Sequence, residues 1–245
     1  MNRFLLLITI VSAFTQFSCQ PTAQSIVDET ISAHGGEVYN SLDVEFDFRK
    51  MHYVIKTNGS DYQYERHQTD SSGIKTVDVL TNSSFVRTIA DEIVTVPDSM
   101  VTKYSNSINS VAYFFLLPAP LNDAAANKKR LEDVEIKGQL YFQIEVTFAQ
   151  EGGGEDFQDR FVYWINHQTK EVDYLAYSYE TNGGGVRFRE AYNVQTENGL
   201  RFCDYRNYGL EDLKTSLEAL PALYEAGNLP LLSSIENENV VVKYK

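Results

Sequence analysis

The chain has 245 residues, 43% of them hydrophobic, and a formal net charge of −13 from 34 acidic and 21 basic side chains. The sequence contains no run of Lys and Arg, which disfavours nucleic-acid binding because that binding depends on neutralising phosphates. The length suits one β-sandwich or barrel domain.

The N-terminus is typical of an export signal. A short basic start, Met1 to Arg3, precedes eleven uncharged, largely apolar residues from Phe4 to Phe14. This run is too short to span a bilayer, which needs about 20 helical residues. We therefore predict a signal peptide over residues 1–18, with a buried N-terminal helix as the alternative.

Cys19 is the predicted lipidation site. The stretch from Phe17 to Gln20 is similar to a lipobox, although Gln16 stands where that motif usually has Leu. Acyl chains on Cys19 would anchor the chain to a membrane through a tether over residues 19–24, and ordinary signal-peptide cleavage is the alternative. The other cysteine, Cys203, lies in an alternating strand pattern, so we expect a buried, inert thiol there.

After the tether, the pattern predicts one helix and then a first group of strands. Helical spacing predicts a helix over residues 25–33, which ends at His34-Gly35-Gly36. Period-two alternation starts at Val44 and predicts about six short strands up to Val96, with hairpin turns such as Asn58-Gly59.

A helical segment separates this group from a second group of strands. Residues 100–117 suit a helix with one buried side, and residues 122–129 suit a short second helix. Alternation over residues 131–205 predicts the second group, followed by helical spacing at 213–220 and a last strand at 240–242. Strands about ten residues apart with turn residues between them predict an antiparallel sandwich or barrel.

One loop has the composition of a weak metal site. Three glycines at 152–154 are surrounded by four carboxylates, which are Glu151, Glu155, Asp156 and Asp159. Oxygen ligands of this kind bind Ca²⁺, although the EF-hand spacing is absent. The alternative is a solvated hairpin tip without a cofactor.

Two arginines and several aromatic residues are candidates for ligand binding. Alternation places Arg187 and Arg189 on one face of a strand, where two guanidinium groups can grip a carboxylate or phosphate. The alternative is an ion-pair ladder with Asp173, Asp156 or Asp159. The aromatic clusters fit a hydrophobic core or the lining of an apolar groove equally well.

No catalytic motif is present in the sequence. The four histidines lack metal-site spacing, and the sequence contains no HExxH, GxSxG or nucleotide-binding glycine loop. We therefore expect a binding protein more than an enzyme.

Several longer stretches resemble an uncharacterised family of envelope lipoproteins from Bacteroidota-type bacteria. The matching stretches are Ala33 to Gly36, Phe46 to Arg49, Tyr113 to Pro118, Leu121 to Asp123, Gly152 to Asp156, Tyr163 to Ile165, Asp173 to Tyr177 and Gly184 to Asn193. The architecture looks like that of the LolA/LolB lipoprotein carriers. The resemblance implies a mainly β (α+β) fold, a curved antiparallel half-barrel of about 10–11 strands with helices packed on the concave face.

Members of such families are sometimes named deoxyribose-phosphate aldolase. That activity implies a TIM barrel of eight alternating βα units, whereas turns in this chain join strand to strand. The aldolase assignment is therefore disfavoured, and the resemblance supplies no catalytic residues.

Together these features predict a single LolA-like β-rich domain over residues 25–245 of an exported, lipid-anchored protein. We expect a periplasm-facing outer-membrane lipoprotein that binds a lipid or another apolar or acylated ligand. The candidate ligand-binding residues are Tyr113, Phe114, Phe115, Trp164, Tyr177, Arg187 and Arg189. Two alternatives remain: a metal-dependent or hydrolytic periplasmic enzyme using the loop at 151–159, and a structural subunit of an envelope complex.

Overall fold

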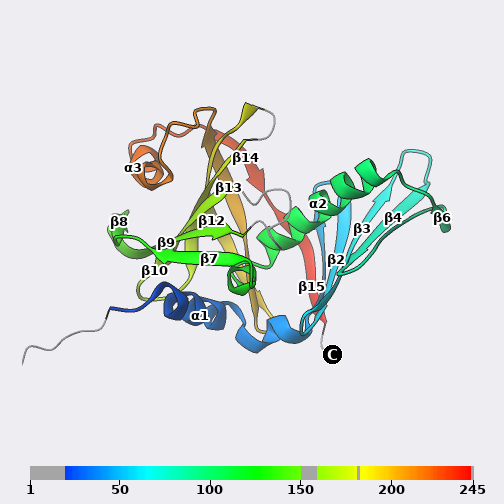
Figure 1. The fold of residues 1–245 in the computed structure, drawn as a ribbon, viewed down its shortest axis with the longest axis horizontal. Coiled ribbons are helices and arrows are strands. Elements are labelled where there is room, and N and C mark those ends of the chain that lie inside the picture. Colours follow the sequence, from blue (N-terminus) through cyan, green and yellow to red (C-terminus); the bar gives the residue numbers. More distant parts are fainter. Residues whose placement is uncertain (1–19, 150–158, 181–182, 244–245) are drawn as a thin grey trace, which may run out of the picture.

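The computed structural model describes residues 20–149, 159–180 and 183–243. In these ranges the protein is mainly β, with two open antiparallel sheets that lie side by side (Figure 1). The first sheet has the order β15-β1-β2-β3-β4-β5-β6. Its strands are β1 (Asp43–Phe48), β2 (Met51–Asn58), β3 (Asp61–Thr69), β4 (Lys75–Thr81), β5 (Phe85–Ile89), β6 (Glu92–Val94) and β15 (Asn237–Lys243).

The second sheet has the order β14-β13-β12-β11-β10-β9-β7, with the short β8 also paired to β9. Its strands are β7 (Ala126–Arg130), β8 (Val134–Ile136), β9 (Gln139–Phe148), β10 (Arg160–Asn166), β11 (Val172–Tyr179), β12 (Gly185–Glu197), β13 (Leu200–Leu210) and β14 (Leu231–Ile235). Only Glu236 separates β14 from β15, so the chain passes directly from one sheet to the other.

Three α-helices and three short 3-10 helices complete the described fold. The helices are α1 (Ala23–His34), η1 (Gly36–Ser41), α2 (Asp98–Phe115), η2 (Ala119–Asn122), η4 (Leu217–Ala219) and α3 (Leu220–Glu225). None of the helices in the described part of the chain is long and apolar enough to cross a membrane.

The predicted fold class is confirmed, and three details differ. The described strands number fifteen, not 10–11, because the two sheets carry extra edge strands. The helix predicted over 122–129 is wrong, since β7 forms there by pairing with β9, and strand pairing overrides local helix propensity. Helix α1 begins at Ala23, so it includes the last two residues of the predicted tether, Ala23 and Gln24.

The β12–β13 hairpin ties the two sheets together. Asn198 and Gly199 form its tip with φ of +50° and +83°, the left-handed pair that a tight type I′ turn requires. From this tip the Asn198 amide donates to the Val242 carbonyl at 2.6 Å, and the Glu197 carboxylate accepts from the Val242 amide at 3.1 Å. The tip of the hairpin therefore reaches β15, the edge strand of the first sheet.

The same strand contributes to both cores. Leu200 and Phe202 of β13 pack with β1, β2 and β15, whereas Cys203 and Tyr205 pack against the second sheet. Burial raises the pKa of the Cys203 thiol to about 11, which fits the inert thiol expected from the sequence.

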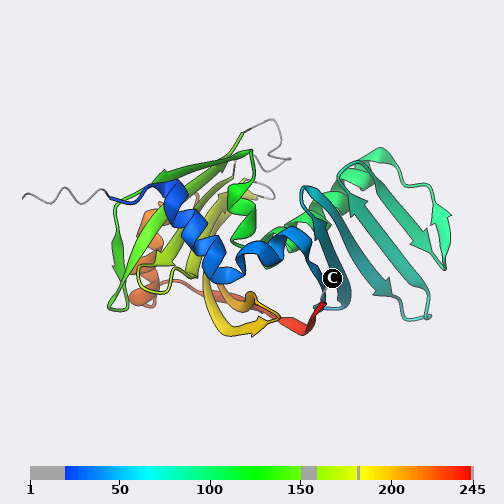
Figure 2. The same ribbon diagram turned by 90° about the horizontal axis from the view of Figure 1, so that it is seen from below.

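The end of α2 fills the space between the sheets (Figures 1 and 2). Ala112, Phe115 and Leu116 pack on the first sheet, and the Phe115 ring stacks on Phe46 with centroids 4.0 Å apart. Leu117 and the rings of Tyr113 and Phe114 pack on the second sheet with α1. Successive residues at the helix end thus bind opposite sheets.

The rest of α2 lies over a charged cluster on the first sheet. The buried Asp78 carboxylate accepts from Arg66 at 2.6 Å and from Arg87 at 2.6 Å. Tyr104 of α2 covers the Arg87 guanidinium at 3.6 Å, and Arg66 donates to Ser107 at 3.0 Å. Polar contacts therefore hold this half of the helix, whereas apolar contacts hold its end.

A buried histidine joins α1 to β13. His34 Nε2 lies 2.9 Å from a guanidinium nitrogen of Arg201, which can only donate, so Nε2 must accept. Nδ1 then carries the proton and donates to the Thr30 carbonyl at 2.9 Å. Burial and the Arg201 charge lower the pKa of His34 to about 4, so the folded protein holds this ring neutral.

This histidine makes stability depend on pH. Its folded pKa of about 4 lies below the ordinary histidine value of 6.5, so its contribution to stability is complete above pH 6.5 and is lost as the pH falls toward 4. Between pH 7 and pH 5 the free energy of unfolding should fall by about 2 kcal/mol from this group. Urea unfolding of the full chain at both pH values measures the change.

His34→Gln is the matched variant, because the amide oxygen can still accept from Arg201 but does not titrate. We expect the drop in unfolding free energy between pH 7 and pH 5 to shrink by about 2 kcal/mol in this variant. An equal drop in both proteins would show that His34 is not the titrating group.

Candidate functional site

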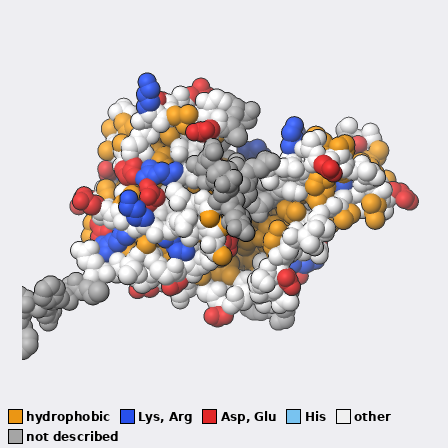
Figure 3. All heavy atoms as spheres, in the orientation of Figure 1, with side chains coloured by type: hydrophobic (Ala, Val, Ile, Leu, Met, Phe, Trp, Pro, Cys, Tyr) orange, Lys and Arg blue, Asp and Glu red, His pale blue; other side chains and the backbone are white. Residues whose placement is uncertain are grey.

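A cavity of about 820 Å³ lies between the two sheets, with α2 forming one wall. Figure 3 shows hydrophobic side chains gathered in the hollow between the two lobes. Strands β1, β3, β4 and β15 of the first sheet supply one side of the lining, and β9 to β14 of the second sheet supply the other. The polar residues Ser105, Asn106, Asn109 and Ser110 of α2 also line the cavity.

Aromatic rings cover the side of the cavity formed by the second sheet. Phe161 lies beside Tyr177 in the antiparallel register, with ring centroids 5.4 Å apart. Phe148 contacts Phe161 at 5.8 Å, and Phe114 of α2 contacts Tyr177 at 5.6 Å. These rings form a continuous surface that suits a hydrocarbon chain.

Two phenol hydroxyls meet at this aromatic surface. The hydroxyls of Tyr113 and Tyr163 lie 2.7 Å apart, and burial raises the pKa of both groups. Both phenols therefore stay protonated, so they connect α2 to β10 by a neutral hydrogen bond and supply no base.

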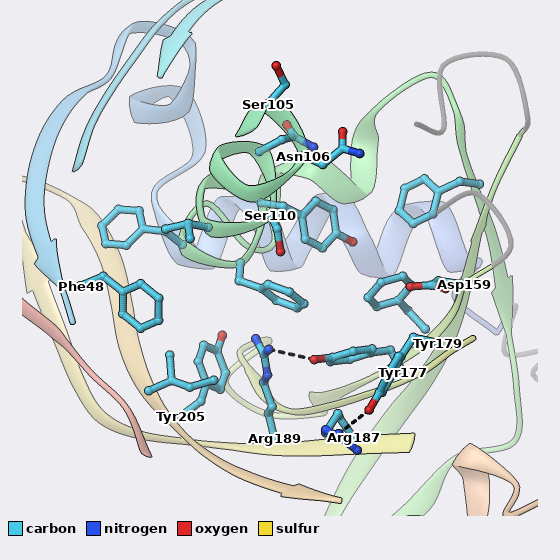
Figure 4. Close-up of a pocket in the computed structure, with 18 of the residues that line it drawn as sticks. Phe48, Ser105, Asn106, Ser110, Asp159, Tyr177, Tyr179, Arg187, Arg189 and Tyr205 are labelled. Atoms are coloured by element: carbon cyan, nitrogen blue, oxygen red, sulfur yellow. Dashed lines mark hydrogen bonds between the residues drawn. The ribbon is translucent and has the colours of Figure 1, made fainter. Parts of the chain in front are cut away.

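Arg189 is the buried cation of the cavity. Its side chain is 8% exposed, and its guanidinium carbon lies 3.8 Å from the Phe114 ring centroid and 5.2 Å from that of Tyr177. One terminal nitrogen donates to the Tyr177 hydroxyl at 3.0 Å, as Figure 4 shows. Its Nε atom is buried and has no hydrogen-bond partner among the described residues.

Arg187 lies beside Arg189 on the same face of β12. It donates to the Tyr179 hydroxyl and, at 3.0 Å, to the Val186 carbonyl (Figure 4). A Cβ atom at Gly209 would lie 2.6 Å from the Val186 carbonyl oxygen and 2.9 Å from the Arg187 Cδ. Glycine at this position therefore leaves room for the neighbouring backbone and for the arginine side chain.

The charge of the lining contrasts with the charge of the chain. Of the described residues that line the cavity, three are arginines and two are aspartates, although the whole chain has a net charge of −13. These residues are Arg49, Arg187, Arg189, Asp123 and Asp159. Neither Arg187 nor Arg189 forms an ion pair with a carboxylate of the described residues, so the alternative ion-pair ladder is not seen there.

The structure brings six of the seven candidate ligand-binding residues together around this cavity. They are Tyr113, Phe114, Phe115, Tyr177, Arg187 and Arg189. Trp164 lies elsewhere: it is fully buried on the opposite face of β10, where its indole donates to Gln143 at 2.8 Å. That face is covered by Leu217 and Leu220 of η4 and α3.

Sequence reasoning missed other lining residues. Phe161 and Tyr179 share the strand faces of Tyr163 and Tyr177, so strand alternation could have indicated them. Phe48, Tyr62 and Leu80 belong to the first sheet, and no local pattern connects them with the second.

Of the four carboxylates in the predicted metal-binding loop, the structure describes one, Asp159. Glu151, Glu155 and Asp156 lie outside the described residues, and Asp159 lines the cavity. No group of three or more potential metal ligands occurs within residues 20–149, 159–180 and 183–243. Cys19 also lies outside the described ranges.

The chain belongs to a family of unknown function, DUF6503, whose model matches residues 1–237. A search of the curated proteins found no match.

Solved structures with a similar fold come from several bacteria. A LolA superfamily protein from Nitrosomonas europaea matches with a TM-score of 0.55 and 12% identity, covering 92% of this chain and 96% of that one. A DUF1329 family protein from Desulfovibrio piger gives a TM-score of 0.46 and 10% identity, covering 77% and 86% of the two chains. A domain assigned to outer membrane lipoprotein sorting, from Vibrio parahaemolyticus, gives 0.45 and 9%, covering 76% and 85%. The first match shows that the fold is LolA-like, a curved half-barrel.

Arg189 has no carboxylate partner within the described ranges, which predicts an unusual effect of its removal on stability. Arg189→Met removes a buried charge and keeps a long apolar side chain, so the free energy of unfolding should stay within about 1 kcal/mol of the parent value or rise. Asp78→Asn is the contrast, because that carboxylate neutralises two guanidinium groups, and its loss should cost about 3–5 kcal/mol. Urea unfolding compares the two variants. An equally large loss in Arg189→Met would mean that Arg189 has a strong partner within the protein.

Proposed function

We propose that the protein binds an apolar or acylated ligand in the cavity between its two sheets, as an exported envelope protein of the lipid-carrier type. The observation that carries this proposal is the aromatic lining of a cavity of about 820 Å³. Cavities of roughly 300–1,000 Å³ with mostly apolar walls and a few polar groups are typical of small-molecule sites.

The fold supports the proposal in a second way. An open half-barrel leaves the concave face of its sheets uncovered, and in the described part of the chain α1 and the end of α2 fill part of that space. The LolA superfamily protein from Nitrosomonas europaea is similar to this chain in this open fold. A carrier-like role fits the shape, because an apolar ligand can enter between the sheets without unfolding either of them.

Export and anchoring are the sequence-based part of the proposal. In this proposal, a signal peptide at residues 1–18, acylation of Cys19 and one LolA-like domain over residues 25–245 would put the cavity on the periplasmic side of the outer membrane. With α1 starting at Ala23, the tether between Cys19 and the first helix is three residues long. The acyl anchor would therefore hold the domain close to the membrane surface.

The two alternatives remain predictions of the sequence. An enzyme would depend on the loop at 151–159, of which only Asp159 is described, and a structural subunit would depend on a large exposed apolar patch.

Blocking the cavity should abolish binding of a neutral probe. We expect the purified chain to bind the fluorescent alcohol cis-parinaryl alcohol, and Ser110→Trp to weaken this binding at least about tenfold by filling the lined space. Thr102→Trp is the matched control, because Thr102 is exposed on the same helix and does not line the cavity. Equal binding by both variants would contradict the proposed site.

Native mass spectrometry after mild purification tests for a natural ligand. The parent chain should carry an apolar molecule that Ser110→Trp lacks. If repeated preparations of the parent chain contain no such molecule and the alcohol does not bind, the proposal is wrong.

Removing the predicted anchor should release the protein from the membrane. Cys19→Ala should eliminate incorporation of a labelled fatty acid and move the protein from the membrane to the soluble envelope fraction. Cys203→Ala, which changes the other cysteine, should leave both readouts unchanged. Label retained in Cys19→Ala would disprove acylation at this position.

A further inference from the structure

The position of Arg189 raises a question that an apolar ligand alone does not answer. A buried charge is costly unless a counter-charge lies beside it. Arg189 is only 8% exposed, yet among the described residues its side chain hydrogen-bonds to one phenol and lies against two aromatic rings. Its Nε atom has no acceptor among the described residues, although the side chain lines the cavity.

The surroundings hold this guanidinium group in a fixed position. Phe114 lies against it at 3.8 Å, and Tyr177 accepts a hydrogen bond from one of its terminal nitrogens at 3.0 Å. Because the Tyr177 oxygen accepts in this contact, its own proton stays available for a ligand. The Tyr205 ring lies next to Arg189 at the same end of the cavity (Figure 4).

Arg187 provides a second guanidinium group two residues away on the same strand face. Its contacts with the Val186 carbonyl and the Tyr179 hydroxyl leave its charge without a carboxylate partner in the described part of the chain. Two planar cations with phenol hydroxyls beside them match the oxygens of a carboxylate or phosphate group, which arginine binds through two parallel hydrogen bonds.

We propose that the cavity binds an anionic amphiphile, with its carboxylate or phosphate at Arg189 and Arg187 and its hydrocarbon chain against the rings of Phe114, Phe161 and Phe148. This inference rests on the proposed function and names the ligand class for the same cavity. The acidic group of the ligand supplies the counter-charge that the described residues do not give Arg189, and the aromatic surface described above receives the chain.

The position of the charges also selects against other ligands. A neutral lipid would leave both guanidinium groups without a counter-charge, and a cationic amphiphile would be repelled by them. A small anion without a chain would leave the aromatic surface exposed to water. Only a molecule with both parts satisfies both regions of the cavity.

The test compares two probes with the same hydrocarbon chain. cis-Parinaric acid carries a carboxylate and cis-parinaryl alcohol does not, so the ratio of their Kd values isolates the acidic group. At pH 8 the parent chain should bind the acid about 10–100-fold more tightly than the alcohol, the gain expected from hydrogen bonds to a charged group. Arg189→Gln should lose most of this preference and bind the alcohol within about twofold of the parent chain.

Controls separate the charge of Arg189 from its structural role. Arg206→Gln removes an exposed arginine of β13 that does not line the cavity, so its preference for the acid should be unchanged. Arg189→Lys keeps the charge without the planar fork and should retain part of the preference. If Arg189→Gln does not fold, Arg187→Gln should still reduce the preference for the acid.

Competition identifies the source of the acidic group. Palmitate and palmitoyl lysophosphatidic acid are each titrated against bound parinaric acid, with hexadecanol as the neutral competitor. Displacement by either anion at lower concentration than hexadecanol supports the inference, and the better of the two indicates a carboxylate or a phosphate.

The remaining outcomes overturn one proposal or both. Equal affinities for the acid and the alcohol would disprove the anionic ligand and leave the proposed function standing. If neither probe binds the parent chain, the proposed function fails, and the inference fails with it.

Discussion

The structure depends on one apolar contact region that both sheets share. The last turn of α2 places Phe115 against Phe46 of the first sheet, while Tyr113, Phe114 and Leu117 pack on the second sheet. Strand β13 does the same, with Leu200 in one core and Tyr205 in the other. Because burial of large side chains contributes about 1.5–3 kcal/mol each, this region can hold two sheets that share few other contacts. The cavity lies where that packing ends.

Strand alternation in the sequence predicted much of the fold. The helix expected over residues 100–117 is α2, and the expected hairpin turn at Asn58-Gly59 joins β2 to β3. The arrangement into two sheets depends on the pairing of β15 with β1, which joins residues about 200 positions apart and leaves no local pattern. The wrong helix at 122–129 has the same cause, since pairing with β9 decides the structure of β7.

The candidate site was also predicted only as far as local sequence patterns allow. Alternation correctly grouped Arg187 with Arg189, and pairing between β11 and β12 then placed Arg187 opposite Tyr177. Alternation also places Tyr163 and Trp164 on opposite faces of the strand, but it does not predict which of the two faces lines the cavity. That choice depends on the helices, since α3 and η4 cover the Trp164 face and α2 borders the other one. The position of the site therefore depends on packing between segments that are distant in the sequence, which strand alternation does not predict.

The central claim is that ligand binds between the sheets, with its head group at β12 and its chain along α2 and β10. A palmitic acid analogue with a photoreactive diazirine in mid-chain tests this most directly, by cross-linking and peptide mass spectrometry. The account predicts labelled residues in 105–115 of α2 and in β10 and β11, and loss of label when excess palmitate is added. Labelling confined to the exposed apolar side chains of the first sheet, such as Ile89 and Ile93, would contradict it.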